Sequence, residues 1–243
     1  MVHSVADEQV SQPAAEVAYA QIKQAIITGT LAPGGKVSEP ALAHSMGVSR
    51  TPVHQAIVRL QSEKWLEVSS RRGILIAPLD AAELREVYEV LIGLEGLAVA
   101  SLAARPSQDE SVDLDIAAAA QRCENALAAK DLHLWAEADN SFHNMLLERS
   151  GNFTLCRVAA PMAEHAHRAR LLTVNLRPWP TTSNEDHARI VGGIRRRDPQ
   201  EARAALDNHR RRGIATLVPI LQAFVPAPAF AFTPIRPRVD ATA

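Results

Sequence analysis

Two short helices separated by a glycine turn are the feature that most limits how this chain folds. Ser38 is a suitable N-cap for a helix over residues 39–46, which tolerates Pro40 in its first turn and ends at Gly47. Ser49 precedes a second helix, and its buried face is marked at helical spacing by Val53, Ala56, Ile57 and Leu60. Two helices joined by so short a turn are typical of a helix-turn-helix.

The flanking segments extend this motif into a small domain. Residues 66–69 alternate in polarity, residues 70–73 (SRRG) form a basic turn, and residues 74–77 form a largely β-branched run, which together predict a β-hairpin or wing. An amphipathic helix from about residue 16 to 28 precedes a turn-rich connector at residues 31–36. We therefore predict a flexible arm over 1–13 and a winged helix-turn-helix over 14–79.

The second helix of such a pair enters the major groove of DNA by its N-terminal end. Arginine binds guanine or phosphate, while hydroxyl groups at a helix N-terminus suit phosphate. Two arginines at the hairpin tip are placed to reach the backbone or the minor groove. The predicted DNA-binding residues are Ser49, Arg50, Thr51, His54 and Gln55 on the helix, and Arg71 and Arg72 on the wing.

Composition is compatible with a DNA-binding protein but does not by itself indicate one. The net charge is −1, yet residues 14–79 hold seven basic and four acidic side chains. No apolar run is long enough to span a membrane, and the first residues lack the pattern of a secretory signal. Cys123 and Cys156 are therefore expected to be buried free thiols in a cytoplasmic protein without a membrane partner.

From Asp80 onward the pattern is helical. Apolar periodicity predicts six helices, at about 80–104, 109–129, 131–150, 153–176, 184–196 and 199–223, and no convincing strand. The fold class is thus mostly α: a winged helix-turn-helix followed by an all-α bundle over 80–224. The proline-rich residues 225–243 are predicted to be a disordered tail.

Four residues of the bundle form a candidate metal site. Asp139 and His143 are four apart on one predicted helix, and His187 and His209 lie on two later helices. A bundle can bring such side chains to one point, and three imidazoles with a carboxylate suit Zn, Ni, Mn, Fe or Co. The residues alone also allow surface histidines or hydrogen-bonded core histidines.

The chain resembles the GntR family of regulators. The segment LAPGGKVSEPALAHSMGVSRTPVHQAIVRL and the RRG wing tip match its winged helix. The segments LIGLEGLAVASLAAR, ADNSFHNMLLERSGN and EDHARIVGGIRRRDPQEARAALDNH resemble the helical ligand-binding (FCD) domain of its FadR-type branch, and six helices resemble the VanR-like subgroup. The resemblance implies a homodimeric regulator, expected to be a repressor, on a pseudo-palindromic operator. It also implies a divalent metal on Asp139, His143, His187 and His209, and a small organic acid effector.

The chain departs from the family pattern at three positions. Pro40, His54 and Leu91 stand where relatives commonly carry arginine, so we expect an atypical operator and an altered effector site. Arg168 and Arg170 are the candidate replacements for the missing effector-binding arginine. The runs at 195–197 and 210–212 are interpreted as solvent-facing cations.

Two other functions remain open at this stage. The metal itself could be the signal, if the ion is held by four protein ligands with no cavity beside it. A metallohydrolase would need a general acid or base near the metal, and Glu164 is the only candidate. The DNA-binding domain would be unexplained in a hydrolase, so we predict that the protein is not an enzyme.

Overall fold

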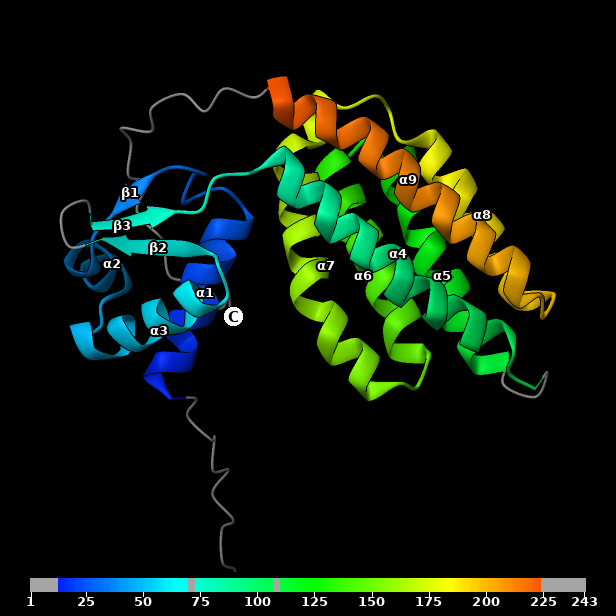
Figure 1. Cartoon of the computed structure of the whole chain (residues 1–243), viewed down its shortest axis with the longest axis horizontal. Coiled ribbons are helices and arrows are strands. Elements are labelled where there is room, and N and C mark those ends of the chain that lie inside the picture. Colours follow the sequence, from blue (N-terminus) through cyan, green and yellow to red (C-terminus); the bar gives the residue numbers. More distant parts are fainter. Residues whose placement is uncertain (1–12, 70–72, 107–109, 224–243) are drawn as a thin grey trace, which may run out of the picture. The chain divides into compact units, whose positions relative to one another are not determined.

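The computed structural model describes residues 13–69, 73–106 and 110–223, and the chain divides into two compact units (Figure 1). The boundary lies between Ala77 and Pro78, close to the predicted boundary after Leu79. Apart from Pro13, the predicted arm (1–13) lies outside the described residues, as does the predicted tail (225–243).

The first unit is a winged helix-turn-helix. Its elements are α1 (Ala14–Ile27), β1 (Lys36–Val37), α2 (Glu39–Met46), α3 (Arg50–Ser62), β2 (Leu66–Ser69) and β3 (Gly73–Ile76). The antiparallel sheet has the order β1-β3-β2, with Val37 opposite Ile74 and Leu66 opposite Ile76. The sequence analysis missed β1, because two residues beside a glycine turn show no alternation and form a strand only by pairing with β3.

Local signals explain the helix-turn-helix. The Ser38 hydroxyl accepts a hydrogen bond from the Ala41 amide at 3.3 Å, and Gly47 ends α2 with φ of 67°, a left-handed conformation that favours glycine. Ser49 occupies the N-cap position of α3, but its hydroxyl makes no capping hydrogen bond, contrary to the capping signal in the sequence. The core of the unit is apolar and includes Ile22, Ile26, Leu42, Val53, Ile57, Leu60, Trp65 and Ile76.

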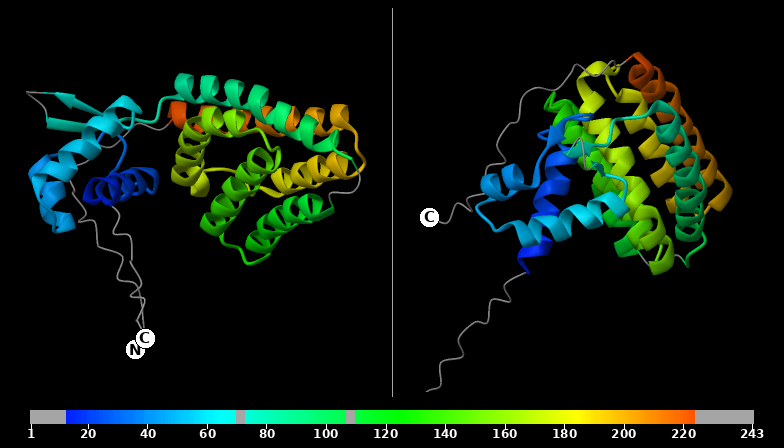
Figure 2. Two further views of the ribbon diagram at one scale, coloured as in Figure 1. Left: turned by 90° about the horizontal axis from the view of Figure 1, so that it is seen from below. Right: turned by 60° about the vertical axis from the view of Figure 1, so that its left-hand side comes forward.

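The second unit is an all-α bundle over its described residues. It contains α4 (Ala81–Ala103), α5 (Glu110–Ala128), α6 (Leu132–Arg149), α7 (Phe153–Thr173), the 3-10 turn η1 (Val174–Leu176), α8 (Thr181–Arg195) and α9 (Pro199–Ala223). Helices α4 and α9 lie side by side (Figure 2). All six predicted helices are present, although α7 gives way to η1 at its end and α8 starts three residues early, directly after Pro180.

Side-chain caps and one close helix contact determine how the bundle is assembled. Asp80, Asp131 and Asn152 each accept a hydrogen bond from a backbone amide in the first turn of the following helix, at 2.8, 2.8 and 3.0 Å. A Cβ at Gly193 would lie 2.7 Å from the Ala202 backbone nitrogen, so glycine allows α8 and α9 to approach closely. This contact joins the two helices that carry His187 and His209.

The bundle core contains Leu91, which is fully buried among Leu84, Leu147, Leu155 and Leu217. Both cysteines are free, as predicted, with Cys123 buried and Cys156 half-buried. Among the described residues, no helix combines the length and the apolar character that crossing a bilayer requires.

Candidate nucleic-acid interface and metal centre

The N-terminal end of α3 presents a polar, exposed surface. Ser49, Arg50, Thr51, His54 and Gln55 are all exposed, because the apolar side chains between them, such as Val53, point into the core. The end of the helix that a helix-turn-helix inserts into the major groove is therefore free to contact DNA. Arg71 and Arg72, the predicted wing contacts, lie outside the described residues.

His54 has an acidic partner on the neighbouring helix. Its Nδ1 lies 2.9 Å from Oε1 of Glu39, the first residue of α2, while 64% of the His54 side chain remains exposed. Pro40, the other departure from the expected pattern, follows Glu39 and is exposed. His54 is thus held on one side by a carboxylate, and no residue that the structure describes bonds its Nε2, which can face a base or a phosphate.

Three helices of the second unit bring the four predicted metal ligands together. Asp139 and His143 come from α6, His187 from α8 and His209 from α9, and one donor atom of each lies within 4.8 Å of the other three. All four side chains are buried. Sequence spacing predicted only that Asp139 and His143 lie close together. The packing of α8 against α9, and of α6 within the bundle, brings His187 and His209 to the same point.

The donor atoms converge with few hydrogen bonds to satisfy them. Nε2 of His143 lies 3.1 Å from Nε2 of His209, and Oδ1 of Asp139 lies 3.3 Å from Nε2 of His187 without forming a hydrogen bond. Buried nitrogen and oxygen atoms without partners carry a free-energy cost. Three imidazoles and one carboxylate are a suitable ligand set for a divalent transition metal, so these residues fit such an ion.

Two further carboxylates lie behind the histidines. Oε2 of Glu95 lies 3.2 Å from Nδ1 of His143, and Oδ2 of Asp186 lies 3.7 Å from Nδ1 of His209. Carboxylates on the far nitrogen of a ligating histidine orient its ring and select its tautomer. The Nε2 atoms therefore point toward the common centre.

The protonation states also suit a cation. Burial lowers the pKa of His143 to about 3 and that of His209 to about 4, so both rings are neutral near pH 7. Burial alone would raise the pKa of Asp139, but the charge of Arg170 and the contact with His187 outweigh it and hold the pKa well below its usual value. Neutral imidazoles and an ionised carboxylate are the forms that bind metal.

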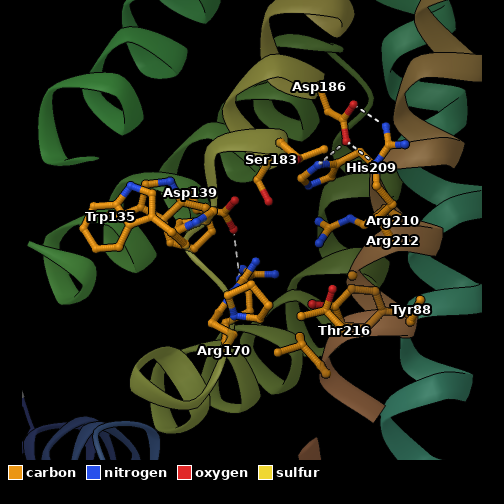
Figure 3. Close-up of a pocket in the computed structure, with 18 residues that line it drawn as sticks. Tyr88, Trp135, Asp139, Arg170, Ser183, Asp186, His209, Arg210, Arg212 and Thr216 are labelled. Carbon is orange, nitrogen blue, oxygen red and sulfur yellow. Dashed lines mark hydrogen bonds and ion pairs between the residues drawn. The ribbon is translucent and has the colours of Figure 1, made fainter. Parts of the chain in front are cut away.

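A cavity of about 250 Å³ adjoins this centre, and Asp139 and His209 are part of its wall (Figure 3). Arg170 also lines it, with Nε 2.9 Å from Oδ2 of Asp139. Arg168 is buried but is not among the cavity-lining residues, because positions two apart on a helix point in roughly opposite directions. Of the two candidate effector-binding arginines, the structure brings only Arg170 to the cavity.

The expectation that the run 210–212 consists of solvent-facing cations was wrong for Arg210, whereas Arg211 and Arg212 are exposed. Arg210 is 2% exposed and makes a bidentate ion pair with Glu95, with its Nε 2.8 Å from Oε2. Arg212 makes a similar pair with Asp186, at 2.8 Å from Nε to Oδ2. A glutamate within the apolar run of α4 was the sequence signal for this pairing, because a buried charge requires a partner.

In the run at 195–197, Arg195 and Arg196 are exposed as expected, whereas Arg197 is half-buried and its Nη2 lies 2.9 Å from Oδ2 of Asp113.

Sequence analysis also missed Arg177, in the connector between η1 and α8, which lines the cavity beside Trp179. Nothing in its local sequence distinguishes it from an ordinary loop arginine. Glu164, the candidate acid or base of a hydrolase, is half-buried and is absent from the cavity lining.

Comparison with known families assigns both units. Residues 14–76 match the family described as bacterial regulatory proteins, gntR family, and residues 86–212 match the FCD domain. The chain belongs to the GntR family, in the branch that carries an FCD domain. Like the GntR-family proteins that it matches, it is a DNA-binding transcriptional regulator and not an enzyme.

Individual relatives are named as HTH-type transcriptional regulators, and a solved structure shares the fold. An HTH-type transcriptional regulator in the TAR-I ttuE-ttuC' intergenic region of Agrobacterium vitis is 40% identical over 132 residues, which cover 54% of this chain and 77% of that protein. A regulator from Streptomyces ambofaciens is 30% identical over 197 residues, covering 79% and 80%. The structure of E. coli McbR/YncC has the same fold, with a TM-score of 0.72 at 19% identity over 88% of this chain and 99% of that one.

Proposed function

We propose that this GntR-family regulator is a homodimer that binds a pseudo-palindromic operator and responds to a small organic acid bound beside a divalent metal. The observation that carries the proposal is the convergence of Asp139, His143, His187 and His209 beside a cavity, which Asp139 and His209 line. The DNA-contacting residues would be Ser49, Arg50, Thr51, His54 and Gln55, with Arg71 and Arg72 of the wing.

The protein would hold the metal through three imidazoles and the Asp139 carboxylate. When bound, a divalent transition metal supplies concentrated positive charge that attracts a carboxylate. Around it, Glu95 and Asp186 hold the rings of His143 and His209, and Arg170 holds the second oxygen of Asp139. The residues of the chain thus orient the ligand set, while the cavity admits the acid.

An effector changes DNA binding only if it binds the DNA-competent and DNA-incompetent states with different affinity. The helices that supply the metal ligands, α6, α8 and α9, are the elements whose packing an acid in the cavity would alter. The repressor prediction requires that deletion of the gene raises expression from the operator, and an activator would lower it.

The first experiment tests the metal. Purified full-length protein is analysed by native mass spectrometry and elemental analysis, beside His187→Ala and, as a control, His44→Ala, whose exposed side chain lies in the other unit. We expect one equivalent of a divalent transition metal in the wild type and the control, and a large loss in His187→Ala. Equal metal content in all three proteins would refute the proposed ligand set.

The second experiment tests the DNA surface. Arg50→Ala is expected to weaken operator binding by about 1–3 kcal/mol in a gel-shift titration, because Arg50 is the exposed cation at the start of α3. Arg211→Ala, an exposed arginine of α9, is the matched control. Arg50→Ala with wild-type affinity would contradict the proposed reading surface.

A regulator that senses the metal itself is the second candidate function. The cavity beside the ligands and its arginines favour an organic acid instead, because a site that senses only an ion needs no such space. Adding metal alone and metal with acids to the operator-binding assay separates these functions. A full response to metal alone would favour the second candidate.

A further inference from the structure

The cavity beside the proposed metal centre is lined by four arginines, and three of them already have a carboxylate. Arg170 contacts Asp139, Arg210 pairs with Glu95, and Arg212 pairs with Asp186. The charge of each of these three guanidinium groups is therefore already balanced by a carboxylate of the protein.

Arg177 is different. Among the described residues no carboxylate lies within ion-pair distance of it, and its Nε is buried without a hydrogen-bond partner. Its guanidinium carbon lies 4.8 Å from the centre of the Trp135 ring. Burial lowers the pKa of Arg177, but an arginine stays protonated throughout the neutral range. The cavity wall therefore carries a partly desolvated positive charge that, among the described residues, has no carboxylate in direct contact.

The surroundings hold this guanidinium in place. The indole Nε1 of Trp135 donates a hydrogen bond to Oδ1 of Asn184 at 2.9 Å, which fixes the ring on which Arg177 rests. Pro178 and Pro180, which follow Arg177 in the connector, also line the cavity and restrict its backbone. An ordered charge loses little side-chain entropy when an anion binds to it.

We infer that Arg177 binds a second anionic group of the effector, so that the preferred effector is a diacid rather than a monoacid. This inference rests on the proposed function, in which the first carboxylate lies beside the metal. The aromatic rings of Tyr88, Trp135 and Trp179 in the cavity wall provide apolar surface for the part of the molecule between its acid groups.

Calorimetric titration of metal-loaded, full-length protein with matched pairs of acids tests the inference. The pairs are succinate and butyrate, glutarate and valerate, and phthalate and benzoate. We expect at least one diacid to bind the wild type about tenfold to a hundredfold more tightly than its monoacid, which is typical of a hydrogen bond to a charged group. Equal affinities within every pair would overturn the inference.

Variants then assign the preference to Arg177. Arg177→Gln should weaken diacid binding much more than monoacid binding and so abolish the diacid preference, and Arg177→Lys should retain part of the preference. Arg211→Gln removes an equal charge from an exposed site on α9 and should behave as wild type. If Arg177→Gln keeps the full preference, the second anion binds elsewhere and the inference is wrong.

Two further measurements separate this inference from a structural role and from the proposed function. Arg177→Gln should leave the melting temperature of the protein without effector unchanged or raise it, since it removes an uncompensated charge, whereas a structural residue would lower it. His187→Ala tests the metal anchor. A diacid preference that persists in His187→Ala but disappears in Arg177→Gln would refute the proposed metal anchor and support the role of Arg177.

Discussion

Replacing Glu95 by alanine should destabilise the bundle more than any surface change. Glu95 is 0% exposed, accepts two hydrogen bonds from the 2% exposed Arg210, and faces Nδ1 of His143. Removing one partner of a buried ion pair leaves an uncompensated charge and typically costs about 3–5 kcal/mol. At about 2–4 °C per kcal/mol for a unit of this size, the melting temperature should fall by about 6–20 °C.

Thermal unfolding of full-length protein, measured by circular dichroism with a chelator present, tests this value without a contribution from bound metal. Glu89→Ala, an exposed position on the same helix, is the control and should stay within about 0.5 kcal/mol of wild type. Combining Glu95→Leu with Arg210→Met should recover most of the loss, because an apolar pair leaves no buried charge. A Glu95→Ala protein within about 1 kcal/mol of wild type would show that the pair does not stabilise the bundle as argued.

Three further perturbations test other parts of the structure. Gly193→Ala should clash with α9 and destabilise the bundle in a denaturant titration, whereas Gly93→Ala, with no atom within 4 Å, should be neutral or stabilising. Burial alone would raise the pKa of Glu63, but hydrogen bonds from neighbouring groups outweigh this effect. The pKa of Glu63 is therefore lower than its usual value. Its stabilising effect is therefore present above its unfolded pKa and lost as the pH falls through the folded value, so Glu63→Gln should reduce the acid sensitivity of the first unit in a pH series of melts. Glu39→Gln should alter operator affinity in a gel shift by freeing His54, and unchanged affinity over a panel of operator variants would exclude that role.

Much of the fold is encoded in local signals that can be read without the structure. The starts of α4, α6 and α7 follow Asp80, Asp131 and Asn152, whose side chains cap them, and Asp and Asn are residue types favoured at helix N-caps. Strand β1 has no such signal, since two residues become a strand only by pairing with β3. Elements defined by their own periodicity were therefore predicted to within a few residues, and an element defined by a distant partner was missed.

The same distinction applies to the candidate site. Asp139 and His143 share a helical face, and the resemblance to a family implies His187 and His209 as their partners. The four candidate ligands could therefore be chosen from sequence. The carboxylates of Glu95 and Asp186 could not, because their partners depend on which helices pack together. Nor does sequence show that Arg210 is buried while Arg211, its neighbour, is exposed. Residue type indicates what a side chain can bind, and tertiary packing decides which of those contacts it makes.

Leu91 and Arg177 show why a missing motif residue does not by itself define a missing function. Leu91 is fully buried and fills the apolar core, a position where an arginine would need a carboxylate of its own. Arg177 reaches the cavity from a connector, where no carboxylate among the described residues pairs with its charge and its guanidinium lies over a tryptophan ring. A cation on a connector can be gained or lost at little cost to the core. Substitutions in the connector can therefore change the effector preference more readily than substitutions in α4, because the inner face of α4 packs in the bundle core.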